Sequence, residues 1–255
     1  MICVLSPAKI QNFKVPTSVA KHTTPQYLEQ ASCLMDRVRE MSISELAALL
    51  KVNVNLAQLN VDRHFQWQLP FTIDNAKQAV FSFNGEVFHG LNPQGFDDSQ
   101  LDYLQSHLRI FSGLYGLLRP LDLMQAYRLD VGDKFHVDGK NLYAFWDSKI
   151  TESINEAFEN DSHKEKVLLN LASGEYIKCI KRPLLKAKVI DFEFLQSVDD
   201  GYKPIVVYIK KARGMMVRYV VANQIEHLAD LRGFCSEGYW YNPQLSTPTK
   251  MVFTR

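Results

Sequence analysis

Apolar residues recur at helical spacing in several stretches of the chain. Over residues 25–39 they stand three or four positions apart, which places them on one face of an amphipathic helix. Ser42, with Glu45 three positions later, has the pattern of a capping box at the start of a second helix. The helices predicted from this spacing cover residues 25–39, 43–50, 55–67, 97–107, 142–158 and 214–224.

Short runs rich in β-branched and apolar residues predict the strands. Two of these runs form a pair, because the turn between them contains Asp200 and Gly201. Helices come both in blocks and between strands, so the expected class is α+β, a mixed sheet flanked by helices. With no internal repeat or linker, residues 1–255 are expected to form a single domain. The predicted strands are residues 2–5, 80–83, 167–171, 188–194 and 205–210.

Composition narrows the class of protein. With 46% apolar and 22% charged residues, the chain is typical of a folded protein and not of a disordered one. No apolar run approaches the ~20 residues that span a bilayer, and the N-terminus lacks the basic region of a signal peptide. The four cysteines are far apart, without a CxxC pair, which favours reduced thiols. We therefore expect a cytoplasmic monomer without a membrane partner.

Charge is distributed unevenly along a chain whose net charge is only +1. From Asp130 to Asp161 there are eight acids against three bases, whereas from Lys164 to Arg218 there are twelve bases against six acids. No acid follows Asp200 in the second run. Such asymmetry can build a local positive surface on a nearly neutral protein, although a set of solvated faces would give the same count.

Four segments place polar or basic residues directly after a predicted strand: residues 6–9, 112–122, 170–176 and 210–214. Strand ends that lead into helix N-termini bind anions, because free N–H groups and the helix dipole favour negative charge. The fourth segment is the strongest candidate for an anion site. Its cations are predicted at the positive end of a helix, where they are unfavourable unless they are solvated or offset by an anion. Each segment alone is also explained as a turn with solvated cations. Together they predict one site on one face.

A second signal is the predicted helix pair at about residues 43–67, which has the pattern of a helix-hairpin-helix. In that motif, N–H groups of the hairpin and of the second helix hold a DNA phosphate without reading sequence. Lys51 and Asn53 replace the usual hairpin glycines, and Asn53 tolerates left-handed geometry better than most residues. A structural helix pair is the alternative interpretation. The phosphate contacts expected here are Lys51, Val52, Asn53 and Asn55.

The sequence contains no recognised motif that would assign a residue to metal binding or catalysis. The seven histidines are dispersed without HExxH or paired Cys/His spacing, so we expect no metal site and no cofactor. His64 is expected to be a partly buried packing residue. Ser173, close to Glu175 and Tyr176, fits a catalytic role and a helix N-cap equally well. Aromatics at residues 239–241 fit base stacking or the core. Catalytic residues stay unassigned.

Six motifs together resemble one known family. They are SPAK at 6–9, SGLYGLLRPLDLMQAYRL at 112–129, FWD at 145–147, NLASGEY at 170–176, KKARG at 210–214 and SEGYW at 236–240. Their order and spread along the whole chain resemble the bacterial YaaA peroxide-stress family. The resemblance implies resistance to hydrogen peroxide, lower free iron and less oxidative DNA damage. It also implies an α+β fold with a helix-hairpin-helix and a positive cleft, and binding to DNA.

These observations lead to a sequence-independent DNA-binding protein of the peroxide response. An enzyme that acts on a nucleotide-like or phosphorylated small molecule in a polar cleft is the alternative, and an iron-binding protein is less favoured because ligands are not clustered. The resemblance places the hairpin at residues 50–57. The cleft cations expected to contact DNA are Lys9, Arg119, Lys210, Lys211 and Arg213.

Overall fold

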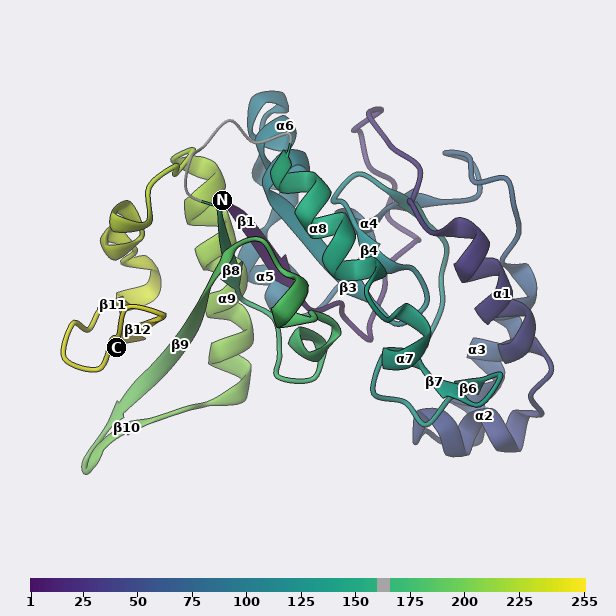
Figure 1. The fold of residues 1–255 in the computed structure, drawn as a ribbon. Helices are drawn as coiled ribbons and strands as arrows, with labels where there is room; N and C mark the ends of the chain where they lie inside the picture. The colour runs from purple at the N-terminus through teal and green to yellow at the C-terminus, as the bar shows by residue number, and fades with distance from the viewer. Residues whose placement is uncertain (160–165) are drawn as a thin grey trace.

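A mixed β-sheet organises the computed structural model, which describes residues 1–159 and 166–255 (Figure 1). The ends of the two charge runs at Asp161 and Lys164 lie outside the described residues. Within them, eight strands form one sheet in the order β11-β12-β9-β8-β1-β3-β4, with β10 paired to β9. Their bounds are β1 Ile2–Leu5, β3 Leu108–Ser112, β4 Gly116–Leu118, β8 Val167–Asn170, β9 Lys188–Val198, β10 Gly201–Lys203, β11 Trp240–Tyr241 and β12 Lys250–Thr254.

The middle of the sheet is parallel and its margins are antiparallel. Strands β12, β9, β8, β1 and β3 run in one direction, while β4 and β11 run against their neighbours. Cys3 of β1 is level with Leu108 of β3 and with Leu169 of β8. The carboxyl ends of these three strands therefore open at the same edge of the sheet, which brings three of the predicted strand exits together. The α+β class with a mixed sheet is confirmed.

Helices lie on both sides of the sheet. In Figure 1, α8 crosses in front of the sheet, α5, α6 and α9 lie behind it, and α1 to α3 form a separate group at the β4 end. None of the described helices is both long and apolar enough to cross a membrane. The bounds are α1 Leu28–Arg39, α2 Ile43–Leu50, α3 Val54–Gln66, α4 Ala79–Ser82, α5 Glu86–Leu91, α6 Asp98–His107, α7 Leu142–Trp146, α8 Lys149–Glu159 and α9 Val206–Ala222. Two small ladders pair β2 Lys77–Gln78 with β5 Leu123–Met124 and β6 His136–Val137 with β7 Lys140–Asn141.

The helix pair is formed as predicted, because its signals are local. Helix α2 covers residues 43–50, and Ser42 Oγ accepts the N–H of Glu45 while the Glu45 carboxylate accepts the N–H of Ser42. This reciprocal capping box satisfies donors that a helix start leaves open. Helix α3 follows after three residues and is capped by the side chain of Asn53.

Two predicted strands are helical in the structure. Residues 80–83 fall mainly in α4, where the amides of Ala79 and Val80 donate to carbonyls of the 120–122 segment. Residues 205–210 enter α9, so the hairpin partner of β9 is the short β10. The β-branched run that suggested a strand belongs to a helix whose buried positions, among them Ala212, Met216 and Val220, stand three to four residues apart. Packing of that face overrides local β-propensity.

The helix predicted over residues 142–158 is interrupted. Asp147 takes a left-handed φ of 43° and ends α7, and α8 starts two residues later. The indole N–H of Trp146 donates to the carbonyl of Gly113 at 2.9 Å, so α7 is fixed to the segment after β3. Helix α8 then turns to cover the sheet through Ile150, Ile154 and Phe158.

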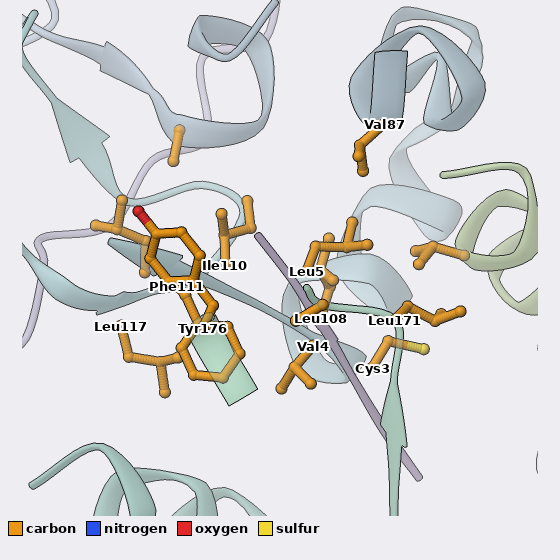
Figure 2. Close-up of a cluster of buried hydrophobic side chains, with 14 of the residues drawn as sticks. Cys3, Val4, Leu5, Val87, Leu108, Ile110, Phe111, Leu117, Leu171 and Tyr176 are labelled. Carbon is orange, nitrogen blue, oxygen red and sulfur yellow. The ribbon is translucent and has the colours of Figure 1, made fainter. Parts of the chain in front are cut away.

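The core is continuous across the strand exits. Figure 2 shows side chains of β1, β3 and β4 meeting Tyr176 and Leu171, which follow β8, and Val87 of α5. The rings of Phe111 and Tyr176 stack with centroids 6.0 Å apart. This packing holds the polar segments after β1 and β8 at fixed positions over the core.

Candidate functional site

Two of the four predicted strand exits are joined by hydrogen bonds, and the stacking of Phe111 on Tyr176 places a third beside them. Ser6, after β1, accepts the N–H of Ser173 at 2.8 Å, and the two hydroxyl oxygens are 3.2 Å apart. Ser112, at the end of β3, is hydrogen-bonded to the hydroxyl of Tyr127 at 2.6 Å. Ser173 also accepts from the N–H of Tyr176 at 3.5 Å, as an N-cap would. Segments 6–9, 112–113 and 170–176 therefore share one location.

A lysine and several acids surround these serines. Lys9 Nζ lies 3.3 Å from a carboxylate oxygen of Asp130, whose other oxygen accepts the hydroxyl of Tyr176 at 3.0 Å. Burial, with repulsion from Asp130, raises the pKa of Asp133 to about 6, although the N–H of Asp130 bonds to its carboxylate. Glu175 accepts the N–H of Gly132 at 3.0 Å. Among the described residues, no three His, Cys, Asp or Glu side chains are placed to hold a metal ion.

Arg119 lies away from this location. Strand β4 runs back along β3, so Arg119 is carried toward the amino end of the sheet, beside Arg109. Its guanidinium donates to Asp122 at 2.9 Å and to the carbonyl of Thr24 at 2.9 Å. The hollow that it lines, with Arg109 and Asp122, shares no residue with the hollow lined by Lys9. The expectation that Arg119 and Lys9 face one cleft is wrong.

The basic segment at 210–214 is also placed differently from the prediction. It lies inside α9 and not at a helix start, so no helix N-terminus opposes its cations. Helix α5 separates it from the strand exits: Gly85 packs on Ala8, and Gly214 packs on the carbonyl of Val87. Lys211 is paired with Glu237 of the SEGYW motif, while Lys210 is exposed. The guanidinium Nε of Arg213 is buried and has no hydrogen-bond partner among residues 1–159 and 166–255.

The hairpin between α2 and α3 is exposed, but its geometry differs from the expectation. Lys51 holds the left-handed conformation, with φ of 53°, whereas Asn53 is extended at −70°. The amides of Lys51 and Val52 donate to carbonyls at the end of α2, so they are not available to a ligand. The Asn53 side chain accepts the N–H of Leu56 at 2.9 Å. Side chains of Lys51, Asn53 and Asn55 face solvent.

The whole set of segments falls inside one family match. Residues 1–245 match the family described as peroxide stress protein YaaA. The chain belongs to this family. Its part in the cell is therefore in the response to peroxide stress, and the resemblance drawn from the SPAK, SGLYGLLRPLD, NLASGEY and KKARG motifs is confirmed.

Two arginines of this YaaA-family chain lie close together without any motif in the sequence that predicts it. Arg63 of α3 and Arg128, in the segment after β5, lie close enough that Arg128 lowers the pKa of Arg63, although burial lowers it more. His64, expected to be partly buried, is almost fully buried, and its Nε2 accepts the N–H of Arg128 at 3.3 Å. Arg128 also lines the small hollow of Lys9. Separation of 65 positions along the chain hides this pairing from any local motif.

The end of α3 is fixed to the core by a buried polar network. The indole N–H of Trp67 donates to the hydroxyl of Tyr115 at 2.8 Å. Gln68 and Gln125 exchange two bonds, in which the N–H of Gln68 donates to Gln125 and the Gln125 amide donates to the carbonyl of Gln68, each at 2.9 Å. Tyr115 and Gln125 both belong to the 112–129 motif. The most specific motif of the sequence thus holds the helix pair in place.

Removal of the Asn53 cap should destabilise the protein slightly, and the substitution leaves the net charge unchanged. We expect Asn53→Ala to lower the free energy of unfolding by about 1 kcal/mol, because the N–H of Leu56 loses its acceptor. Asn55→Ala is the matched control, since its exposed side chain makes no hydrogen bond among the described residues and should change stability by less than about 0.5 kcal/mol. Urea unfolding followed by circular dichroism measures both. Equal stability of the two variants would show that Asn53 does not cap α3.

Proposed function

We propose that the chain is a sequence-independent DNA-binding protein that limits oxidative DNA damage and free iron during peroxide stress. The observation that carries the proposal is the exposed start of α3 next to Lys51. The amides of Val54 and Asn55 donate no backbone hydrogen bond within the described residues, and the first turn of α3 contains no acid. Free N–H groups at the positive end of a helix bind phosphate.

The hairpin supplies charge at the same place. Lys51 is exposed, forms no ion pair in the described part of the chain, and precedes the free amides of Val54 and Asn55 by three and four residues. A lysine side chain and backbone amides contact phosphate oxygens in any sequence, so they give affinity without base readout. Lys9 and Lys210, which are also exposed, are assigned to separate phosphate contacts in this proposal. The fall in free iron is then an indirect effect.

Charge reversal at the hairpin tests the proposal. We expect Lys51→Glu to weaken binding to unrelated duplexes by about tenfold, which corresponds to about 1.4 kcal/mol. The slope of log K against log salt should fall by roughly one unit, because one phosphate contact is lost. Fluorescence anisotropy at fixed salt measures affinity, and a thermal melt of the same preparation checks the fold.

The control is Lys14→Glu, which makes the same charge change at an exposed lysine outside the hairpin. We expect it to alter affinity much less than Lys51→Glu does. If a folded Lys51→Glu protein binds duplexes as well as wild type, α2 and α3 are only a structural pair. If Lys14→Glu weakens binding equally, the effect belongs to net charge and not to the hairpin.

The cluster at the strand exits favours a second function, an enzyme that acts on a nucleotide-like or phosphorylated small molecule. Residues from distant parts of the chain meet there. Ser6 is hydrogen-bonded to Ser173, while Asp130 contacts both Lys9 and Tyr176. Ligands commonly bind at the carboxyl ends of parallel strands. Turnover of such a molecule that Ser173→Ala abolishes, with DNA affinity unchanged, would favour this function over the first.

A further inference from the structure

Two buried hydrogen-bond donors without acceptors, and a third donor with one weak bond, lie between α3 and the segment after β5. His64 Nδ1 and Arg128 Nε are buried and have no partner in the described structure. The Arg63 guanidinium has one weak bond, from NH1 to the amide oxygen of Asn60 at 3.4 Å. Buried polar groups without partners are rare, so two in one place, beside a weakly bonded arginine, indicate that an acceptor belongs there.

The protonation of His64 makes its free nitrogen a donor. Burial, together with the charges of Arg39 and Arg63, lowers the pKa of His64 to about 4, so the ring is neutral near pH 7. Its Nε2 accepts the backbone N–H of Arg128, and in a neutral imidazole the other nitrogen then carries the proton. His64 Nδ1–H is therefore an N–H group that needs an acceptor.

The charges that act on His64 are both positive, while Asp130 lines the neighbouring hollow with Arg128 and pairs with Lys9 there. Neither Arg63 nor Arg128 forms an ion pair within the described residues, and the two repel each other strongly enough to affect the pKa of Arg63. Arg39, which also faces His64, uses its guanidinium to bind the carbonyls of His64 and Trp67 and the carboxylate of Asp36. Half-buried cations without acids are unfavourable unless an anion offsets them.

We infer that Arg63, Arg128 and His64 form a binding site for a phosphate group, next to the helix pair. A phosphate offers several acceptor oxygens and negative charge, which match two guanidinium groups and one neutral N–H donor. Arg128 links this site to Lys9, since both line one hollow at the end of β1. The assignment to a DNA phosphate rests on the proposed function, whereas the site itself can be tested with inorganic phosphate.

The first experiment uses the whole protein and inorganic phosphate at constant ionic strength and pH 7. Imidazole ¹H–¹⁵N correlation spectra should show His64 protonated at Nδ1, and millimolar phosphate should shift that signal. Arg63→Gln/Arg128→Gln should raise the apparent Kd at least tenfold. Arg37→Gln, an exposed arginine of α1, is the matched control and should leave the titration unchanged. Absence of a His64 shift in wild type, or the same shift in the double variant, would overturn the site.

The second experiment compares duplexes with a 5′-phosphate and a 5′-hydroxyl, again against the double variant. Weaker binding of the double variant to both duplexes assigns the site to a backbone phosphate, and weaker binding only to the 5′-phosphorylated duplex assigns it to a strand end. The opposite outcome is that the double variant binds both duplexes as tightly as wild type while Lys51→Glu still weakens that binding. This result would overturn a role of the Arg63–Arg128–His64 site in DNA binding. A His64 shift with phosphate in a protein that binds no duplex would instead overturn the proposed function and leave the phosphate site.

Discussion

Replacement of Gly214 by alanine should lower the free energy of unfolding by about 2 kcal/mol, although alanine is the better helix former. A Cβ atom at this position would lie 1.7 Å from the carbonyl oxygen of Val87 and 2.7 Å from the amide nitrogen of Leu91. Both atoms are backbone, so no rotamer change relieves the contact and α5 and α9 must separate. Overpacking of this kind costs about 3 kcal/mol, and the gain of about 1 kcal/mol in helix propensity offsets only part of it.

Gly174→Ala is the matched control, because a Cβ there meets nothing within 4 Å. We expect its unfolding midpoint in urea to equal that of wild type or to rise slightly. The comparison separates the close approach of the two helices from the general effect of a glycine substitution. A Gly214→Ala protein as stable as Gly174→Ala would contradict the packing of α5 on α9.

Removal of the Arg119 side chain should lower the free energy of unfolding by about as much as Gly214→Ala does, but for an electrostatic reason. Asp122 is only 1% exposed, and Arg119 forms an ion pair with it at 2.9 Å. We expect Arg119→Ala to lower stability by about 2–3 kcal/mol, near the low end for a broken buried pair, because Thr23 and a backbone N–H still bond to Asp122. The melting temperature should fall by roughly 5–10 °C.

The pH dependence of this loss has a definite sign. Burial raises the pKa of Asp122 even with Arg119 present, and loss of the guanidinium should raise it further. A raised folded pKa favours the protonated form, so the deficit of Arg119→Ala should grow as pH rises from about 4 to 7. Asp122→Asn in the same variant should recover part of the stability. Lys21→Ala, which breaks an exposed pair with Asp102, should leave the melting temperature almost unchanged.

These results would also decide the part of Arg119 in DNA binding. The sequence predicts a place for Arg119 in a phosphate-binding cleft, because this cation follows two glycines in the segment after a strand. The structure instead pairs it with an acid three residues later in the same motif. If folded Arg119→Ala protein binds duplexes as wild type does, the residue serves stability alone.

Local signals in the sequence predicted the elements correctly wherever an element is stabilised by residues close to it along the chain. The capping box at Ser42 and Glu45 is complete within four residues, and α2 has the predicted bounds. The same holds for β1 and β8, whose apolar runs are buried in the middle of the sheet. The convergence of the SPAK and NLASGEY segments followed from the rule that parallel strands end at one edge.

Predictions failed where a distant partner decides the structure. Residues 205–210 have β-branched side chains, but α9 forms because glycines at positions 90 and 214 allow it to pack closely on α5. The two glycines are too far apart along the chain for any local pattern to include both. Arg63 and Arg128 were missed for the same reason, since only the folded chain brings them to His64.

The bonds at the end of α3 have a consequence for any complex that the hairpin forms. Trp67 is joined to Tyr115, and Gln68 and Gln125 hold each other by two bonds, so the helix pair is anchored to the sheet and not hinged on a loop. A preorganised element loses little conformational entropy when a ligand binds. In the proposed complex the hairpin keeps its shape, and any bend or opening needed for a close fit falls on the DNA, whose stiffness depends on its sequence.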